Sequence, residues 1–284
     1  MSGVAEAFRL PADASIGRVG LRVRDLEVSL GFYRDVLGLE DRGLGIGAVG
    51  LGAPGGETVL HLAADPATAP RPANVRGLFH VALLLPDRAA LGAALARLLD
   101  AEYALQGFAD HDVSEAIYLA DPDGNGLEVY ADRPRDTWQR AGGSIYMTTR
   151  ELDVRGLLAE RDASGRATMP AATRVGHIHL QVGELRTAEP FYSGLLGLDV
   201  VNRGFPGALF LSAGGYHHHV GLNTWGRPAP EPAGVAGLFE FEVRVPDVHS
   251  RRVLADRLHG HGAVTDSTGL RVEDPEGNRI VITE

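Results

Sequence analysis

Val19-Gly-Leu-Arg-Val-Arg-Asp-Leu26, followed by Phe32-Tyr-Arg-Asp-Val-Leu-Gly-Leu39, specifies the architecture because both segments return at one constant offset. The second copies are Ile178-His-Leu-Gln-Val-Gly-Glu-Leu185 and Phe191-Tyr-Ser-Gly-Leu-Leu-Gly-Leu198. Each copy alternates like a strand, changes to helical spacing, and stops at a glycine suited to a helix C-terminus, Gly38 or Gly197. The pattern therefore predicts a strand and a helix, used twice.

A second repeat lies between and after these copies. Gly77-Leu-Phe-His-Val-Ala-Leu-Leu-Leu-Pro-Asp87 matches Gly237-Leu-Phe-Glu-Phe-Glu-Val-Arg-Val-Pro-Asp247, and Asp121-Pro-Asp-Gly-Asn125 matches Asp274-Pro-Glu-Gly-Asn278. The two pentapeptides are typical of hairpin turns between apolar runs. The sequence thus predicts an α+β fold in which a strand, a helix and about three strands recur four times, with starts near residues 17, 77, 175 and 237.

The same pattern divides the chain into two tandem pairs. Residues 16–131 are expected to hold modules 1 and 2, and residues 175–284 are expected to hold modules 3 and 4. Residues 132–174 form the one long connection, with a short helix expected at Leu152 to Arg161.

Composition excludes several classes of partner. The chain carries 27 basic and 37 acidic side chains, a net charge of −10, without a basic stripe for a nucleic-acid backbone or an anionic membrane. Its first residues lack a signal-peptide pattern, and no window approaches a spanning helix. We expect a soluble cytoplasmic protein that binds a small molecule, with no nucleic-acid or membrane partner; homo-oligomerisation stays open.

Histidine is the unusual residue type. The chain has 11 histidines and no cysteine, so a metal would have to bind imidazole and carboxylate groups. Around the turn at Asp121–Asn125, hairpin geometry places Tyr118 opposite Glu128 on one face of the sheet. A phenol and a carboxylate then share that face.

The four-module pattern resembles the vicinal oxygen chelate superfamily, in which paired βαβββ units curl into cup-shaped half-barrels around a metal. The run from His111 through Tyr118 to Glu128 is similar to the signature of type I extradiol ring-cleaving dioxygenases, the catechol 2,3-dioxygenase type. The resemblance implies that Glu128 binds Fe(II), with Mn(II) as the alternative, and that His111 and Tyr118 contact a catecholic substrate or O2. The implied product is a 2-hydroxymuconic semialdehyde.

The family also takes ligands from the first strand of each module. The corresponding positions are Arg18, His80, His177 and Glu240, so only modules 2 and 3 supply imidazole. His80, His177 and Glu128 would complete a two-histidine, one-carboxylate triad if modules 2 and 3 share one cup. We favour that pairing, because the missing ligands then fall together in modules 1 and 4.

Consecutive pairing is the alternative, because neighbouring elements usually pack together. It would offer the candidates His61, His80 and Glu128 in one cup, and His177, one of His217 to His219, and Glu240 in the other.

Extradiol enzymes place an acid/base histidine near the last strand of this module, and the resemblance assigns that role to His218, with His219 as the second candidate. Strand alternation would put His217 and His219 on the opposite face.

Two other functions stay open on this scaffold. One is a glyoxalase-type metal-dependent isomerase or lyase, and the other is a metal-free protein that sequesters a small molecule, of the bleomycin-resistance kind.

Overall fold

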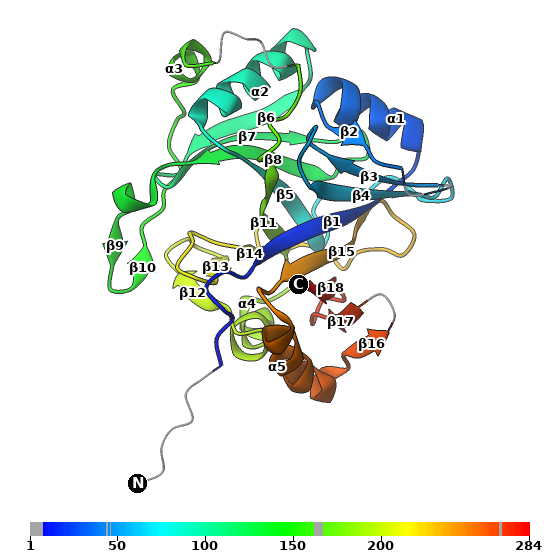
Figure 1. Cartoon of the computed structure of the whole chain (residues 1–284), viewed down its shortest axis with the longest axis vertical. Coiled ribbons are helices and arrows are strands. Elements are labelled where there is room, and N and C mark those ends of the chain that lie inside the picture. Colours follow the sequence, from blue (N-terminus) through cyan, green and yellow to red (C-terminus); the bar gives the residue numbers. More distant parts are fainter. Residues whose placement is uncertain (1–7, 44, 46, 162–166, 267–268) are drawn as a thin grey trace.

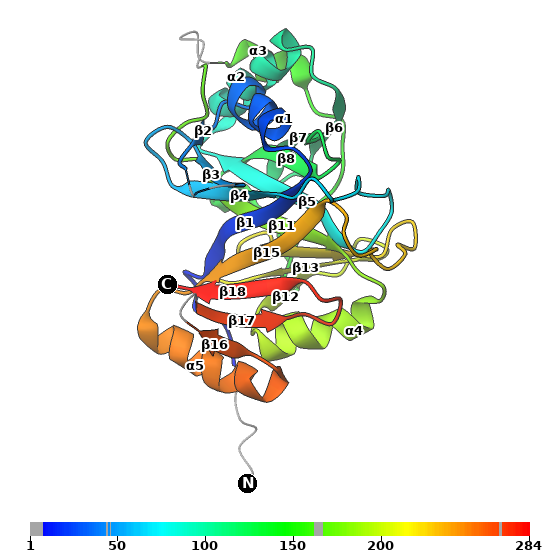
Figure 2. The same cartoon turned by 90° about the vertical axis from the view of Figure 1, so that its right-hand side faces the viewer.

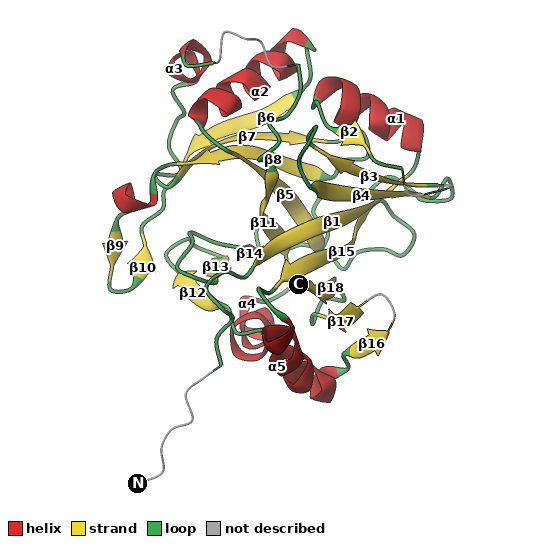
Figure 3. Cartoon of the chain, in the orientation of Figure 1, coloured by secondary structure: helices red, strands yellow, loops and turns green. Residues whose placement is uncertain are grey.

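The computed structural model describes residues 8–43, 45, 47–161, 167–266 and 269–284. Within these residues the strands form two eight-stranded sheets and one two-stranded hairpin. Helices gather at the two ends of the molecule, and the sheets lie between them (Figures 1 and 3). This arrangement confirms the predicted α+β class.

The first sheet joins the second module to the third. Its strand order is β6-β7-β8-β5-β11-β14-β13-β12. The strands are β5 (Gly77–Leu85), β6 (Leu105–Asp110), β7 (Ser114–Ala120), β8 (Gly126–Asp132), β11 (Arg174–Gln181), β12 (Asp199–Asn202), β13 (Ala208–Ser212) and β14 (Val220–Asn223). The two modules meet where β5 pairs antiparallel with β11.

The second sheet joins the first module to the fourth, with the order β16-β17-β18-β15-β1-β4-β3-β2. Its strands are β1 (Ser15–Val23), β2 (Glu40–Asp41), β3 (Ala48–Gly52), β4 (Thr58–Ala64), β15 (Gly237–Arg244), β16 (Val264–Asp266), β17 (Gly269–Glu273) and β18 (Arg279–Thr283). Figure 2 shows β1 and β15 side by side at its centre. The favoured pairing of modules 2 and 3 is confirmed, and the consecutive alternative is wrong.

Helices follow the first strand of each module. They are α1 (Leu26–Leu30) with the π-helical η1 (Gly31–Val36), α2 (Arg88–Asp100), α4 (Leu185–Glu189) with the π-helical η3 (Pro190–Leu195), and α5 (Val248–Leu258). Gly38 and Gly197, with φ of +84° and +87°, follow the two π-helical turns in the left-handed conformation, as predicted for these glycines. The other short elements are η2 (Arg135–Thr137), β9 (Arg140–Ala141), β10 (Ser144–Ile145), α3 (Val154–Ala159) and η4 (His259–His261). Among the described residues, no helix combines the length and apolarity needed to cross a bilayer.

The repeated motifs bind tandem modules to each other. The buried Tyr33 hydroxyl donates to Asp121 at 2.9 Å, and the buried Tyr192 hydroxyl donates to Asp274 at 2.7 Å. Each aspartate also accepts backbone N–H groups within its own turn, at 2.8 to 2.9 Å. The helix of one module thereby fixes the hairpin turn of the next, which explains why both motifs recur at matched positions.

Candidate metal centre

Three buried side chains converge from adjacent strands of the first sheet. The register places Glu128 of β8, Ala82 of β5 and His177 of β11 side by side, and His80 lies two residues from Ala82 on β5. Ala82 is small and fully buried, so it leaves room for the side chains of Glu128, His177 and His80 to approach one another. The predicted opposition of Tyr118 and Glu128 across the β7–β8 hairpin is confirmed.

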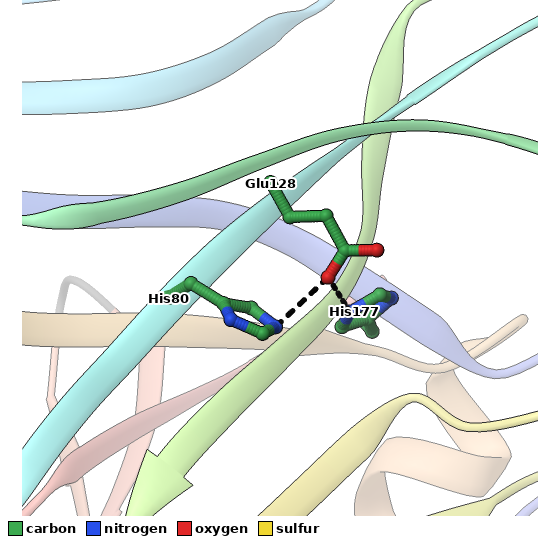
Figure 4. A group of neighbouring side chains, drawn as sticks. All are labelled: His80, Glu128 and His177. Atoms are coloured by element: carbon green, nitrogen blue, oxygen red, sulfur yellow. Dashed lines mark hydrogen bonds and ion pairs between the residues drawn. The ribbon is translucent and has the colours of Figure 1, made fainter. Parts of the chain in front are cut away.

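The three potential metal donors point at one another (Figure 4). The Glu128 Oε2 atom lies 3.0 Å from His80 Nε2 and 3.2 Å from His177 Nε2. One donor atom from each residue lies within 4.8 Å of the other two, and this is the one such group of three or more found among the described residues. His80, Glu128 and His177 are 6%, 3% and 1% exposed, so water does not solvate them freely.

The protonation of this cluster suits a cation. Burial lowers the pKa of His177 to about 4, against the opposing influence of Glu128. Burial by itself raises the pKa of Glu128, but the charge and hydrogen bond of His177 and the contact with His80 outweigh it and bring the pKa well below its usual range. His177 is therefore neutral at pH 7 and Glu128 is a carboxylate. Neutral imidazole and carboxylate are the forms that coordinate metals.

His111 and Tyr118 form a second polar pair beside the cluster. The His111 Nδ1 atom lies 2.6 Å from the Thr148 carbonyl oxygen, which can only accept, so Nδ1 carries the proton in the neutral ring. The Tyr118 hydroxyl then donates to His111 Nε2 at 2.7 Å. Burial, followed by the charge of Glu128, raises the pKa of Tyr118 well above its usual value. Tyr118 is thus a neutral phenol whose one O–H is directed at His111.

The three consecutive histidines do not point to the sides that strand alternation predicts. His217, His218 and His219 precede β14, which begins at Val220, so strand alternation does not govern them. His217 and His218 both line the cavity beside the cluster, and the ring centroid of His218 lies 4.0 Å from that of His177. His219 instead borders a separate cavity near Arg135 and Arg174, where its Nδ1 atom accepts from the Ala213 N–H at 3.1 Å. The structure therefore brings His218, His111, Tyr118, His80, Glu128 and His177 together and leaves His219 outside.

A cavity of about 430 Å³ opens beside these groups. Its wall is largely aromatic and aliphatic, and of the described residues that line it none is a lysine or arginine. The apolar side chains in the wall include Phe79, Phe108, Met147, Phe205, Phe210 and Trp225. A volume of this size is typical of small-molecule sites.

Among its described residues, the second sheet carries no matching set of donors. By the match of the two repeats, Glu242 stands where the first sheet has Ala82, and Arg18 stands where it has His177. Arg18 Nε donates to Glu242 at 2.7 Å, and the Arg18 backbone N–H donates to the same carboxylate at 3.0 Å. An internal ion pair therefore occupies these positions. His61 lies on β4 of this second sheet, opposite Gly20 of β1, and is therefore outside the sheet that carries His80.

The sequence interpretation missed one residue next to the site. Asp132, at the end of β8, accepts a hydrogen bond from His217 at 2.9 Å. The signal was present, because Asp132 lies four residues after Glu128 on the same strand and an even spacing puts both on one face.

Comparisons with known proteins identify the family of this chain. The model of the family described as "Glyoxalase/Bleomycin resistance protein/Dioxygenase superfamily" matches residues 15–129 and 174–282. A Bacillus subtilis (strain 168) catechol-2,3-dioxygenase is 45% identical over 270 residues, which cover 93% of this chain and 94% of that protein. Among solved structures, a Bacillus subtilis protein matches with a TM-score of 0.69 and 14% identity over 97% of this chain and 86% of its own. Glyoxalase I from Zea mays matches with a TM-score of 0.56 and 15% identity over 95% of this chain and 92% of its own. At such identities the two structures show likeness of fold.

Proposed function

Because the chain belongs to the glyoxalase/bleomycin resistance protein/dioxygenase superfamily, we propose that it is an Fe(II)-dependent extradiol dioxygenase. Its substrate is catechol or a substituted catechol, into which it inserts both atoms of O2 to give a 2-hydroxymuconic semialdehyde. The observation that carries the proposal is the convergence of His80, Glu128 and His177 beside a cavity that His218 and the His111–Tyr118 pair also line. Mn(II) is the alternative metal.

The cluster fits a divalent metal by its chemistry. The His80 Nε2 atom is buried without a well-directed hydrogen-bond partner, although it lies 3.0 Å from Glu128 Oε2. Buried polar atoms are normally satisfied, and a metal ion held by His80, His177 and Glu128 would satisfy this nitrogen. Two imidazoles and one carboxylate are the donor set typical of non-heme iron(II) oxygenases.

Each remaining group has a role that follows from its position. Bound iron(II) would supply a Lewis acid that holds the catechol oxygens and dioxygen together. The His218 imidazole accepts a proton from a catechol hydroxyl and later returns it, and such general acid/base catalysis typically contributes about 10²- to 10⁴-fold. The single O–H of Tyr118 donates to His111 Nε2, so the Tyr118 oxygen accepts a hydrogen bond from a catechol hydroxyl, and His111 holds that oxygen in place. The apolar wall excludes water from the reacting atoms.

Anaerobic loading with iron(II), followed by addition of catechol and air, tests this function. We expect one iron per chain, one O2 consumed per catechol, and a yellow product that contains both atoms of ¹⁸O2. Activity that does not depend on added metal would contradict the proposal. Turnover of a thiol adduct with bound nickel or zinc would replace it with a glyoxalase-type isomerase. Tight catechol binding without any metal uptake would replace it with a sequestering protein.

The charge of the cavity wall predicts which catechols react. A ring carboxylate would be buried where the described lining offers neither lysine nor arginine, and an unpaired buried charge costs several kcal/mol. We expect kcat/KM for carboxylated catechols to fall at least about 100-fold below that of alkylated ones, since every 1.4 kcal/mol is a factor of ten. Steady-state O2 uptake measures this ratio. Gln106→Arg adds a cation at the exposed rim of the cavity and should reduce the difference in kcat/KM between carboxylated and alkylated catechols. Equal kcat/KM for the two kinds of catechol in the wild type would contradict the prediction.

A further inference from the structure

A chain of hydrogen bonds runs from a carboxylate through two imidazoles to the cavity. His217 Nε2 lies 2.9 Å from Asp132 Oδ1, and His217 Nδ1 lies 2.8 Å from His218 Nδ1. His217 is 1% exposed, so solvent does not compete for these bonds. His217 and His218 both line the cavity, as do His80 and Glu128 of the cluster.

The direction of each hydrogen bond follows from its partner. The carboxylate of Asp132 offers only acceptor atoms, so the Nε2–H of His217 must donate to it. A neutral imidazole carries one proton, so Nδ1 of His217 is the bare nitrogen and accepts the Nδ1–H of His218. His218 is thereby left with its lone pair on Nε2, which is the nitrogen a proton acceptor needs.

The surrounding side chains hold Asp132 and His217 in place. The Tyr216 hydroxyl donates to the same Asp132 Oδ1 at 3.2 Å, and it therefore accepts from the Tyr130 hydroxyl at 2.7 Å. The ring of His217 packs against Tyr216 and Trp138, with centroid distances of 4.1 Å and 5.3 Å. Few rotations remain open to the imidazole.

We propose that Asp132 and His217 are positioning residues that fix His218 in the tautomer with a bare Nε2 facing the cavity. The inference rests on the proposed function, because it assigns His218 as the group that takes the catechol proton. A carboxylate that fixes an imidazole tautomer has a known precedent in serine proteases, where replacing the carboxylate by an amide costs about 10⁴-fold in kcat. Here the effect passes through a second imidazole.

Asp132→Asn tests the proposal, because the amide keeps the shape but can donate to His217 Nε2 and reverse both tautomers. Tyr216→Phe is the matched control, since it removes the other hydrogen bond to Asp132 Oδ1 and keeps the carboxylate. The first readout is ¹⁵N NMR of histidine-labelled, metal-free protein, assigned with His217→Phe and His218→Phe spectra. We expect His218 to carry its proton on Nδ1 in the wild type and in Tyr216→Phe, and on Nε2 in Asp132→Asn.

The second readout is turnover of the iron-loaded enzyme. We expect kcat of Asp132→Asn to fall at least about 100-fold, with KM and iron content within threefold of the wild type, and kcat of Tyr216→Phe to stay within fivefold. Unchanged tautomers in Asp132→Asn, or an equal loss of kcat in both variants, would overturn the proposal.

If Asp132→Asn does not fold, His217→Phe tests the same assignment of the His218 tautomer. It keeps the ring packing and removes the acceptor of His218 Nδ1, so the single tautomer should become a mixture; a single unchanged tautomer would overturn the proposal. The NMR result is obtained without metal or substrate. A wild type that binds iron but cleaves no catechol therefore refutes the proposed function separately from the tautomer assignment.

Discussion

Replacing Glu128 by glutamine should abolish stoichiometric iron binding and, with it, ring cleavage. The amide keeps the size of the side chain but removes the negative charge that faces both imidazoles, at 3.0 Å from His80 Nε2 and 3.2 Å from His177 Nε2. Loss of a hydrogen-bond partner of a metal ligand typically costs about 10- to 100-fold in affinity, and loss of the ligand itself should cost more. We expect at least about 100-fold weaker iron binding, measured by anaerobic titration.

The matched control for this change is Glu240→Gln. Glu240 occupies on β15 the position that His80 occupies on β5, so the same change of charge is made in the second sheet. We expect iron binding and turnover close to those of the wild type. Circular dichroism of the metal-free proteins checks that both variants fold. Full iron occupancy in Glu128→Gln would remove Glu128 from the ligand set.

Replacing His218 by phenylalanine should separate metal binding from chemistry. The ring of His218 lies 4.0 Å from that of His177 by centroid distance, and phenylalanine retains its packing against Phe210 while removing both nitrogens. Iron content should stay near one per chain, because His218 is not one of the three converging donors. We expect kcat to fall about 10²- to 10⁴-fold, the typical contribution of a general acid/base.

His219→Phe provides the comparison, because His219 borders a different cavity. Stopped-flow kinetics of both variants under saturating O2 distinguish the two neighbours. A large loss in His218→Phe alone supports the assignment. Unchanged kinetics in His218→Phe, or a larger loss in His219→Phe, would move the acid/base role away from His218.

The sequence predicts the site well where local geometry is repeated. The turn at Asp121–Asn125 fixes the β7–β8 register, so the opposition of Tyr118 and Glu128 follows from counting residues across one hairpin. The pairing of modules 2 and 3 follows from a chemical asymmetry in the other two modules. Arg18 stands in place of an imidazole in module 1, and Val281, seven residues after Asp274 as Glu128 is after Asp121, stands in place of the carboxylate in module 4. Repeats and ligand chemistry together therefore predict the topology that places the cluster.

Other features depend on contacts that no periodicity encodes. His217 to His219 lie before β14, in a segment whose side chains are directed by Asp132, His177 and the Ala213 N–H. Alternation was the wrong rule there, because it applies only inside a strand. The π-helical turn at Gly31–Val36 was likewise not predicted, since apolar spacing in so short a helix does not distinguish α-helical from π-helical hydrogen bonding.

Anomalous diffraction at the iron absorption edge, on crystals of the anaerobically loaded protein, tests the central claim most directly. The account predicts one strong peak per chain, between the imidazoles of His80 and His177 and the carboxylate of Glu128. A peak against the second sheet near Arg18 and Glu242, or no peak in protein that carries one iron per chain, would contradict it.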